Sequence, residues 1–100
     1  MNRDAYLREK IVSIAEDTFP DDVGVDWAVI SIEHRGEWSA VTVKPDRDVG
    51  YPGFVFLVSF ADESAPSAVA TYVKMGSSYE LLCTSRGVEK RDVPPRWPPR

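Results

Sequence analysis

The sequence of 100 residues contains one cysteine and one histidine. Cys83 therefore has no partner in the chain for a disulfide, the usual support of a small secreted domain, and we expect a reducing, cytoplasmic location. The single cysteine and single histidine also exclude the common zinc patterns built from four Cys or from Cys and His pairs. We expect no metal site and no cofactor.

The chain also lacks a long hydrophobic run and an excess of positive charge. No apolar stretch approaches the roughly 20 residues that cross a bilayer. The first segment, MNRDAYLREK, is charged where a signal peptide would be apolar. The net charge of −4 argues against nonspecific binding of nucleic acid. We therefore expect neither a membrane nor a nucleic acid as partner.

The first part of the chain has the pattern of a helix. Residues 4–18 predict an amphipathic helix, which Asn2 or Asp4 can cap. Phe19-Pro20 ends it, because the residue before a proline disfavours helical backbone. The apolar stripe of this helix consists of Leu7, Ile11, Ile14, Ala15 and Thr18.

From residue 25 onward, β-branched and aromatic residues replace the helical spacing. Short turns are expected at His34-Arg35-Gly36 and at Gly76-Ser77-Ser78. The predicted fold is α+β, with the N-terminal helix packed on a four- to five-stranded antiparallel meander sheet. This order resembles that of cystatin-like folds, in which a sheet wraps a helix, although no segment matches the inhibitory motifs of cystatins. The predicted strands are 25–33, 37–44, 54–61, 67–75 and 79–85.

The end of the chain differs from the rest. We expect one domain over residues 1–88 and a flexible, proline-rich tail over residues 89–100, because the prolines of VPPRWPPR lack amide donors. The tail fits the proline motifs that aromatic grooves recognise. Alternatively, Trp97 folds back onto the domain or onto a second subunit.

Alternation within the strands places apolar side chains on both faces of the sheet. In the segment 54–61, which is expected to be the central strand, the phenylalanines share one face, while Val55 and Leu57 share the other. One helix covers one face of a sheet. Either the sheet curls around the helix, or the second face meets another copy of the chain, a partner or a ligand.

This excess of apolar surface favours a non-catalytic protein-interaction or homodimerising domain that uses its sheet face. Electrostatics would favour a basic partner for the acidic body of the chain. The alternative is a small-molecule-binding domain or simple enzyme with an aromatic-lined cavity between helix and sheet. A third reading is a structural subunit of a larger assembly.

No set of residues predicts a catalytic centre, and phosphate-binding, dinucleotide-binding and nucleophile-elbow motifs are absent from the sequence. We expect His34 in an exposed turn and Cys83 as a small hydrophobe in or near the core. A nucleophilic Cys83 would need His34 beside it. The candidate binding residues are Trp27, Trp38, Asp46, Arg47, Asp48, Tyr51 and Trp97.

For two groups of these candidates, the residue types indicate which kind of ligand or partner they would bind. Trp27 and Trp38, as cross-strand neighbours on the helix-free side of the sheet, would anchor a partner or an apolar ligand, although both could equally be core residues. Asp46, Arg47 and Asp48 could bind a cation or a charged ligand, or they could form a solvated loop tip.

Overall fold

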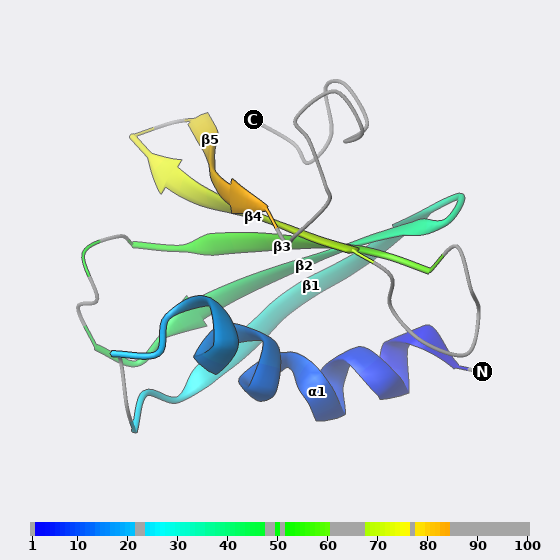
Figure 1. The fold of residues 1–100 in the computed structure, drawn as a ribbon, viewed down its shortest axis with the longest axis horizontal. Helices are drawn as coiled ribbons and strands as arrows, with labels where there is room; N and C mark the ends of the chain where they lie inside the picture. Colours follow the sequence, from blue (N-terminus) through cyan, green and yellow to red (C-terminus); the bar gives the residue numbers. More distant parts are fainter. Residues whose placement is uncertain are drawn as a thin grey trace.

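The structure is a computed structural model, and it describes residues 2–21, 24–47, 50, 52–60, 68–76 and 78–84. The strands form one antiparallel sheet in the order β1-β2-β3-β4-β5, so the expected α+β meander is confirmed with five strands (Figure 1). The predicted tail lies outside the described residues. The elements are α1 (Arg3–Thr18), β1 (Trp27–Arg35), β2 (Trp38–Pro45), β3 (Phe54–Ser59), β4 (Ala68–Met75) and β5 (Ser78–Thr84).

Helix α1 begins at a side-chain cap. Asn2 has extended backbone, and its side-chain oxygen accepts a hydrogen bond from the N–H of Ala5 at 3.2 Å. Asp4, the other expected cap, lies in the first turn, where its charge complements the positive end of the helix dipole. The helix ends at Thr18, just before Phe19-Pro20. The predicted stripe is confirmed as the inner face, with its most buried residues being Leu7, Ile11 and Ala15.

The turn between β1 and β2 is shorter than the sequence pattern suggested. His34 and Arg35 pair with residues of β2, so they belong to the sheet, and the turn consists of Gly36 and Glu37. Gly36 has a φ of 59°, a backbone region that favours glycine. The strand pairing therefore continues up to the residue that allows the chain to reverse.

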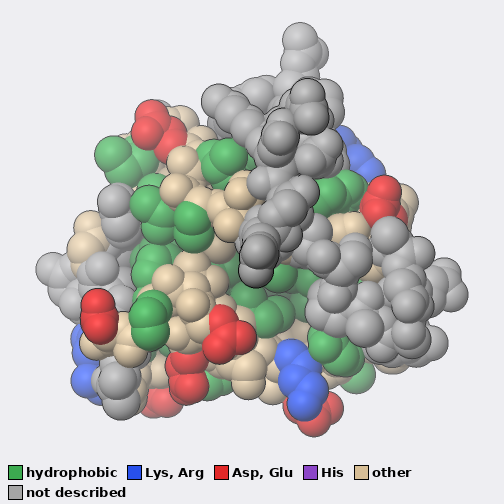
Figure 2. Space-filling model, viewed as in Figure 1, with side chains coloured by type: hydrophobic (Ala, Val, Ile, Leu, Met, Phe, Trp, Pro, Cys, Tyr) green, Lys and Arg blue, Asp and Glu red, His purple; other side chains and the backbone are tan. Residues whose placement is uncertain are grey.

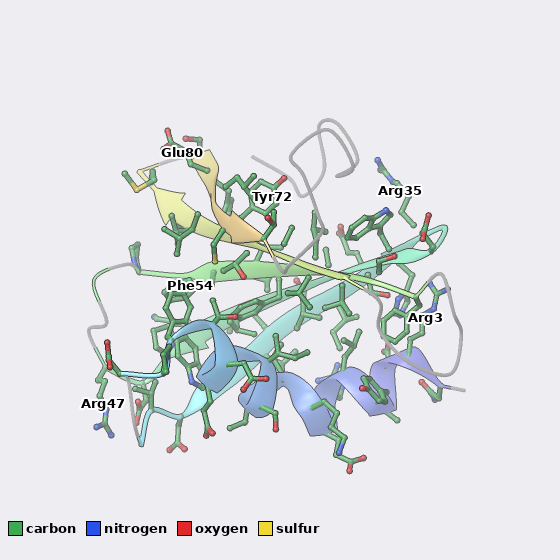
Figure 3. The ribbon with its side chains drawn as sticks, viewed as in Figure 1. Arg3, Arg35, Arg47, Phe54, Tyr72 and Glu80 are labelled. Carbon is green, nitrogen blue, oxygen red and sulfur yellow. The ribbon has the colours of Figure 1, made fainter. Side chains whose placement is uncertain are left out.

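The main core lies between α1 and the sheet, and Phe54 projects into it from the central strand (Figure 3). An aromatic group fills the end of this core below the last turn of the helix. The ring of Phe19 stacks on Trp27 with centroids 5.9 Å apart, and Phe54 packs against both rings at 4.9 and 5.4 Å. Alternation in β3 is confirmed, because Phe54 and its neighbours at every second position belong to this core.

Helix α1 contacts β1 more closely than any other strand. It lies along one side of the sheet, with its first turn beside the β1–β2 turn (Figure 1). Arg3 makes this contact through Nη1, which donates a hydrogen bond to the Gly36 carbonyl at 2.7 Å. The position of the helix determines which parts of the two sheet faces stay uncovered and can bind a ligand or a partner.

Candidate functional site

A second apolar cluster lies on the side of the sheet away from α1, which we call the helix-free face. Leu57 is paired with Ala40 on one side and Ala70 on the other, so a large side chain in β3 is flanked by small ones. The buried centre of the cluster consists of Ala40, Val55, Leu57 and Ala70. Four half-buried rim side chains pack against it, namely Trp38, Tyr72, Tyr79 and Leu81.

Three of the four rim side chains, those of Trp38, Tyr72 and Tyr79, combine apolar area with a polar N–H or hydroxyl group. Tyr72 extends on the opposite side of the sheet from Phe54 (Figure 3). Burial raises the pKa of Tyr72 above its ordinary value of 10.0, so its hydroxyl keeps its proton and can donate a hydrogen bond. Figure 2 shows hydrophobic side chains at the surface in the region of β4 and β5. Aromatic residues of this kind are enriched in protein interfaces.

The charges on the helix-free face differ in sign from the chain as a whole. Strand register places Glu33, Arg35, Lys44 and Lys74 on this face. The Glu37 carboxylate also reaches it, because it accepts a hydrogen bond from Ser59, so the face has three cations and two carboxylates. Lys44 and Lys74 are both exposed. The described part of the face is therefore locally positive, although the whole chain has a net charge of −4.

Both edge strands of the sheet contain a β-bulge. In β1 the register skips Ile30, and in β5 it skips Leu82. These two bulge residues are exposed large hydrophobics, with 61% and 41% of their surface accessible. Bulges twist an edge away from regular pairing, which protects both edges against the addition of another strand.

The expected pair of tryptophans is wrong. Trp27 pairs with Pro45 and Trp38 with Arg35, so the two rings lie at opposite ends of the hairpin. They also lie on opposite faces, because Trp27 belongs to the main core and Trp38 to the rim of the helix-free face. The turn at Gly36 sets this register. Of these two residues, Trp38 remains a candidate for contact with a partner.

Asp46 and Arg47 close the open end of the β1–β2 pair. The Asp46 N–H donates to the Asp26 carbonyl at 2.9 Å, and the Asp26 N–H donates to Asp46 Oδ1 at 3.1 Å. The hydrogen bond from Asp26 lowers the pKa of Asp46, and the adjacent Arg47 guanidinium acts in the same direction. This geometry serves the hairpin itself. Three predicted site residues lie outside the described part of the chain: Asp48, Tyr51 and Trp97.

His34 lies at the end of β1, and the expectation of a turn residue is wrong. It is exposed but has two oriented partners, Asp4 Oδ1 at 2.5 Å from Nε2 and Ser39 Oγ at 2.7 Å from Nδ1. In the neutral ring, Nε2–H donates to the carboxylate and Nδ1 accepts from the serine hydroxyl. No local sequence pattern predicts this set, because Asp4 precedes His34 by 30 residues.

The order Asp4, His34, Ser39 is that of a hydrolase triad, but its geometry does not permit that chemistry. Ser39 is 0% exposed, so a substrate carbonyl has no path to its Oγ. The three side chains instead form a hydrogen-bonded connection between the first turn of α1 and the β1–β2 hairpin. Their role on this geometry is structural.

A cavity of about 340 Å³ lies between the C-terminal end of α1 and strands β4 and β5. Cys83 lies on its wall and is exposed, so the expectation of a small hydrophobe in or near the core is wrong. The helix packs most closely on β1, whereas Cys83 lies in the opposite edge strand, β5. Cys83 and His34 lie on opposite edge strands, which rules out their pairing. The described lining residues are Ile14, Asp17, Thr18, Val69, Thr71, Cys83 and Thr84, and none is aromatic.

Within the described ranges, no three His, Cys, Asp or Glu side chains are grouped to hold a metal ion. The described helix is too short and too polar to cross a membrane. Comparison of the chain with protein-family models, with curated proteins and with solved structures gave no match.

Proposed function

We propose that the protein is a non-catalytic interaction domain that binds another protein through the helix-free face. The observation that carries this proposal is the second apolar cluster, whose rim side chains are half-exposed on the side away from α1. Tryptophan and tyrosine supply much of the binding energy of protein interfaces, because they bury a large area at a low cost in conformational entropy.

The charges of the face support a partner with carboxylates around an apolar centre. Lys44 and Lys74 flank the cluster from β2 and β4. Charges within about 8 Å of a contact act on it more strongly than the net charge of the chain, because salt screens the distant ones. The local surface therefore favours an acidic contact region in the partner, although the whole chain is acidic.

The bulges in the edge strands support binding through the face. Partners that add a strand to a sheet need a regular, open edge. Here Ile30 and Leu82 interrupt the pairing pattern in both edge strands. The pairing of β2, β3 and β4 has no register shift, so the helix-free face offers continuous side-chain contacts across these three strands.

A second copy of the chain is the other candidate partner. The half-exposed rim side chains of the same face would allow two copies to pack against each other. In such a dimer, however, the exposed Lys44 and Lys74 of one copy would lie near the lysines of the other. This like-charge repulsion favours a different protein as the partner.

The dye 8-anilinonaphthalene sulfonate tests the face, because it combines apolar rings with one negative charge. We expect the native protein to bind it, Leu81→Asp to abolish binding, and Lys74→Glu to weaken binding by up to about fivefold, as for one exposed charge pair. Val12→Asp is the matched control, since Val12 is 42% exposed on α1. Native protein that binds no dye, or equal binding by Leu81→Asp and Val12→Asp, would contradict the proposal.

A further inference from the structure

We propose that the cavity between the C-terminal end of α1 and strands β4 and β5 binds a primary aliphatic amine. The cavity has a volume of about 340 Å³ and lies on the side of the sheet that carries α1. It is therefore separate from the helix-free face, and the two proposals stand or fall independently. Three features of its lining identify the ligand class: a carboxylate that forms no ion pair among the described residues, a threonine hydroxyl and two aliphatic side chains.

The carboxylate belongs to Asp17, in the last turn of the helix. The backbone carbonyls at a helix C-terminus carry partial negative charge, and sequences usually place Lys or Arg there. The last turn of α1 has no basic residue and contains Glu16 and Asp17 instead. Among the described residues, no cation forms an ion pair with Asp17. Acidic residues in the last turn of a helix, beside a cavity, are typical of a site in which a bound ligand neutralises the negative charge.

The hydroxyl belongs to Thr71, in β4. Thr71 is 2% exposed and lines the cavity, and its side chain makes no hydrogen bond within the described part of the chain. A threonine hydroxyl can both accept and donate a hydrogen bond, so Thr71 offers a polar contact to a ligand in the cavity. Thr18 adds a second oxygen, because its hydroxyl donates to the Ile14 carbonyl at 2.9 Å and keeps its lone pairs. An ammonium group has three donors, which match these acceptors and the Asp17 carboxylate.

The aliphatic part of the wall limits the rest of the ligand. Ile14 and Val69 are half-buried and line the cavity from α1 and β4. They suit a chain of methylene groups. A volume of about 340 Å³ is at the lower end of the range for small-ligand sites, which favours a short alkyl amine over a nucleotide or a large cofactor. A free amine and a lysine side chain share this chemistry.

The test is a titration of the full chain followed by amide NMR spectra. The probes are cadaverine, Nα-acetyl-lysine methylamide and the uncharged pentanol. We expect the amines to shift signals of residues in 14–18, 69–71 and 83–84, and pentanol to shift none of them. Binding of cadaverine alone identifies a free amine as the ligand, and binding of the lysine derivative identifies a lysine side chain. Equal binding of pentanol, or the absence of shifts at these residues with both amines, would overturn the proposal.

Two variants that each remove one negative charge distinguish binding in the cavity from nonspecific attraction of the amine to the acidic end of the helix. Asp17→Asn should weaken amine binding by roughly fivefold, the effect of one exposed ion pair, and should preserve the fold. Glu16→Gln removes the neighbouring charge, which does not line the cavity, and should change affinity by less than about twofold. Equal effects of the two variants would show nonspecific attraction to an acidic helix end and would contradict the site.

Discussion

The Nε2 atom of His34 lies 2.5 Å from a carboxylate oxygen of Asp4, which joins the end of β1 to the first turn of α1. Arg3 makes a second connection to the same hairpin through the Gly36 carbonyl. Together these contacts fix where the helix starts on the sheet. The buried stripe that begins at Leu7 then follows the main core.

Asp4→Asn should lower the free energy of unfolding by about 0.5–1 kcal/mol, because the pair is only partly buried and solvent screens it. Urea denaturation measures this change. Glu9→Gln is the matched control, since Glu9 lies on the same helix in a more exposed contact with Lys10 at 3.7 Å. Equal stability of the two variants would show that the contact with His34 contributes nothing.

His34→Ala should cost more, by about 1–3 kcal/mol, because it also leaves the buried Ser39 hydroxyl without its acceptor. The double variant His34→Ala/Ser39→Ala should recover part of this loss, since it removes the unsatisfied group. A double variant less stable than His34→Ala would argue that the loss comes from packing of the imidazole ring instead.

The pH dependence of stability should report the hydrogen bond from Asp26 to Asp46. This bond lowers the pKa of Asp46 below its ordinary value of 3.8 in the folded state. The stabilisation is therefore present above the pKa of the unfolded chain and is lost as the pH falls through the lower, folded value. Asp46→Asn lacks the titrating group. The stability difference between the two proteins should be largest at neutral pH and should disappear in strong acid.

Chemical denaturation of both proteins over a series of pH values checks this prediction. A difference that stays constant with pH would show that Asp46 contributes through its hydrogen-bonding oxygen alone. A difference that grows on acidification would contradict the direction of the pKa change.

Cys83 should react with a thiol reagent in the native protein. Its side chain is exposed on the wall of the cavity, so iodoacetamide should label it without unfolding. Mass spectrometry of the intact protein, with and without urea, measures the rate in each state. Labelling that occurs only in urea would contradict the exposed position. Leu82→Ala, at the adjacent bulge, should leave native labelling intact.

The local patterns of the sequence predicted most of the fold. Alternation separated Phe54 from Leu57 correctly, because neighbouring side chains of a strand point to opposite faces. The position of the turn did not follow from alternation, and moving it separated Trp27 from Trp38. The exposure of Cys83 depends on where the helix crosses the sheet, which no periodicity encodes.

The candidate sites were harder to predict than the fold. The Thr71 hydroxyl and the Asp17 carboxylate come from a strand and a helix that are distant in sequence, and their cavity arises from packing. The helix-free face was expected to be apolar, but its positive charge required the strand register of Lys44 and Lys74. Net charge alone pointed to the opposite kind of partner.

Site-specific photo-crosslinking in the native cell tests the role of the helix-free face most directly. The photoreactive residue p-benzoylphenylalanine would replace Tyr79 on the rim or, as the control, Val12 on α1. The proposed function predicts one discrete crosslinked protein with the probe at position 79 and none at position 12, and Lys44→Glu/Lys74→Glu should remove that product. No product at position 79, or the same products at both positions, would contradict the proposal that this face binds a protein.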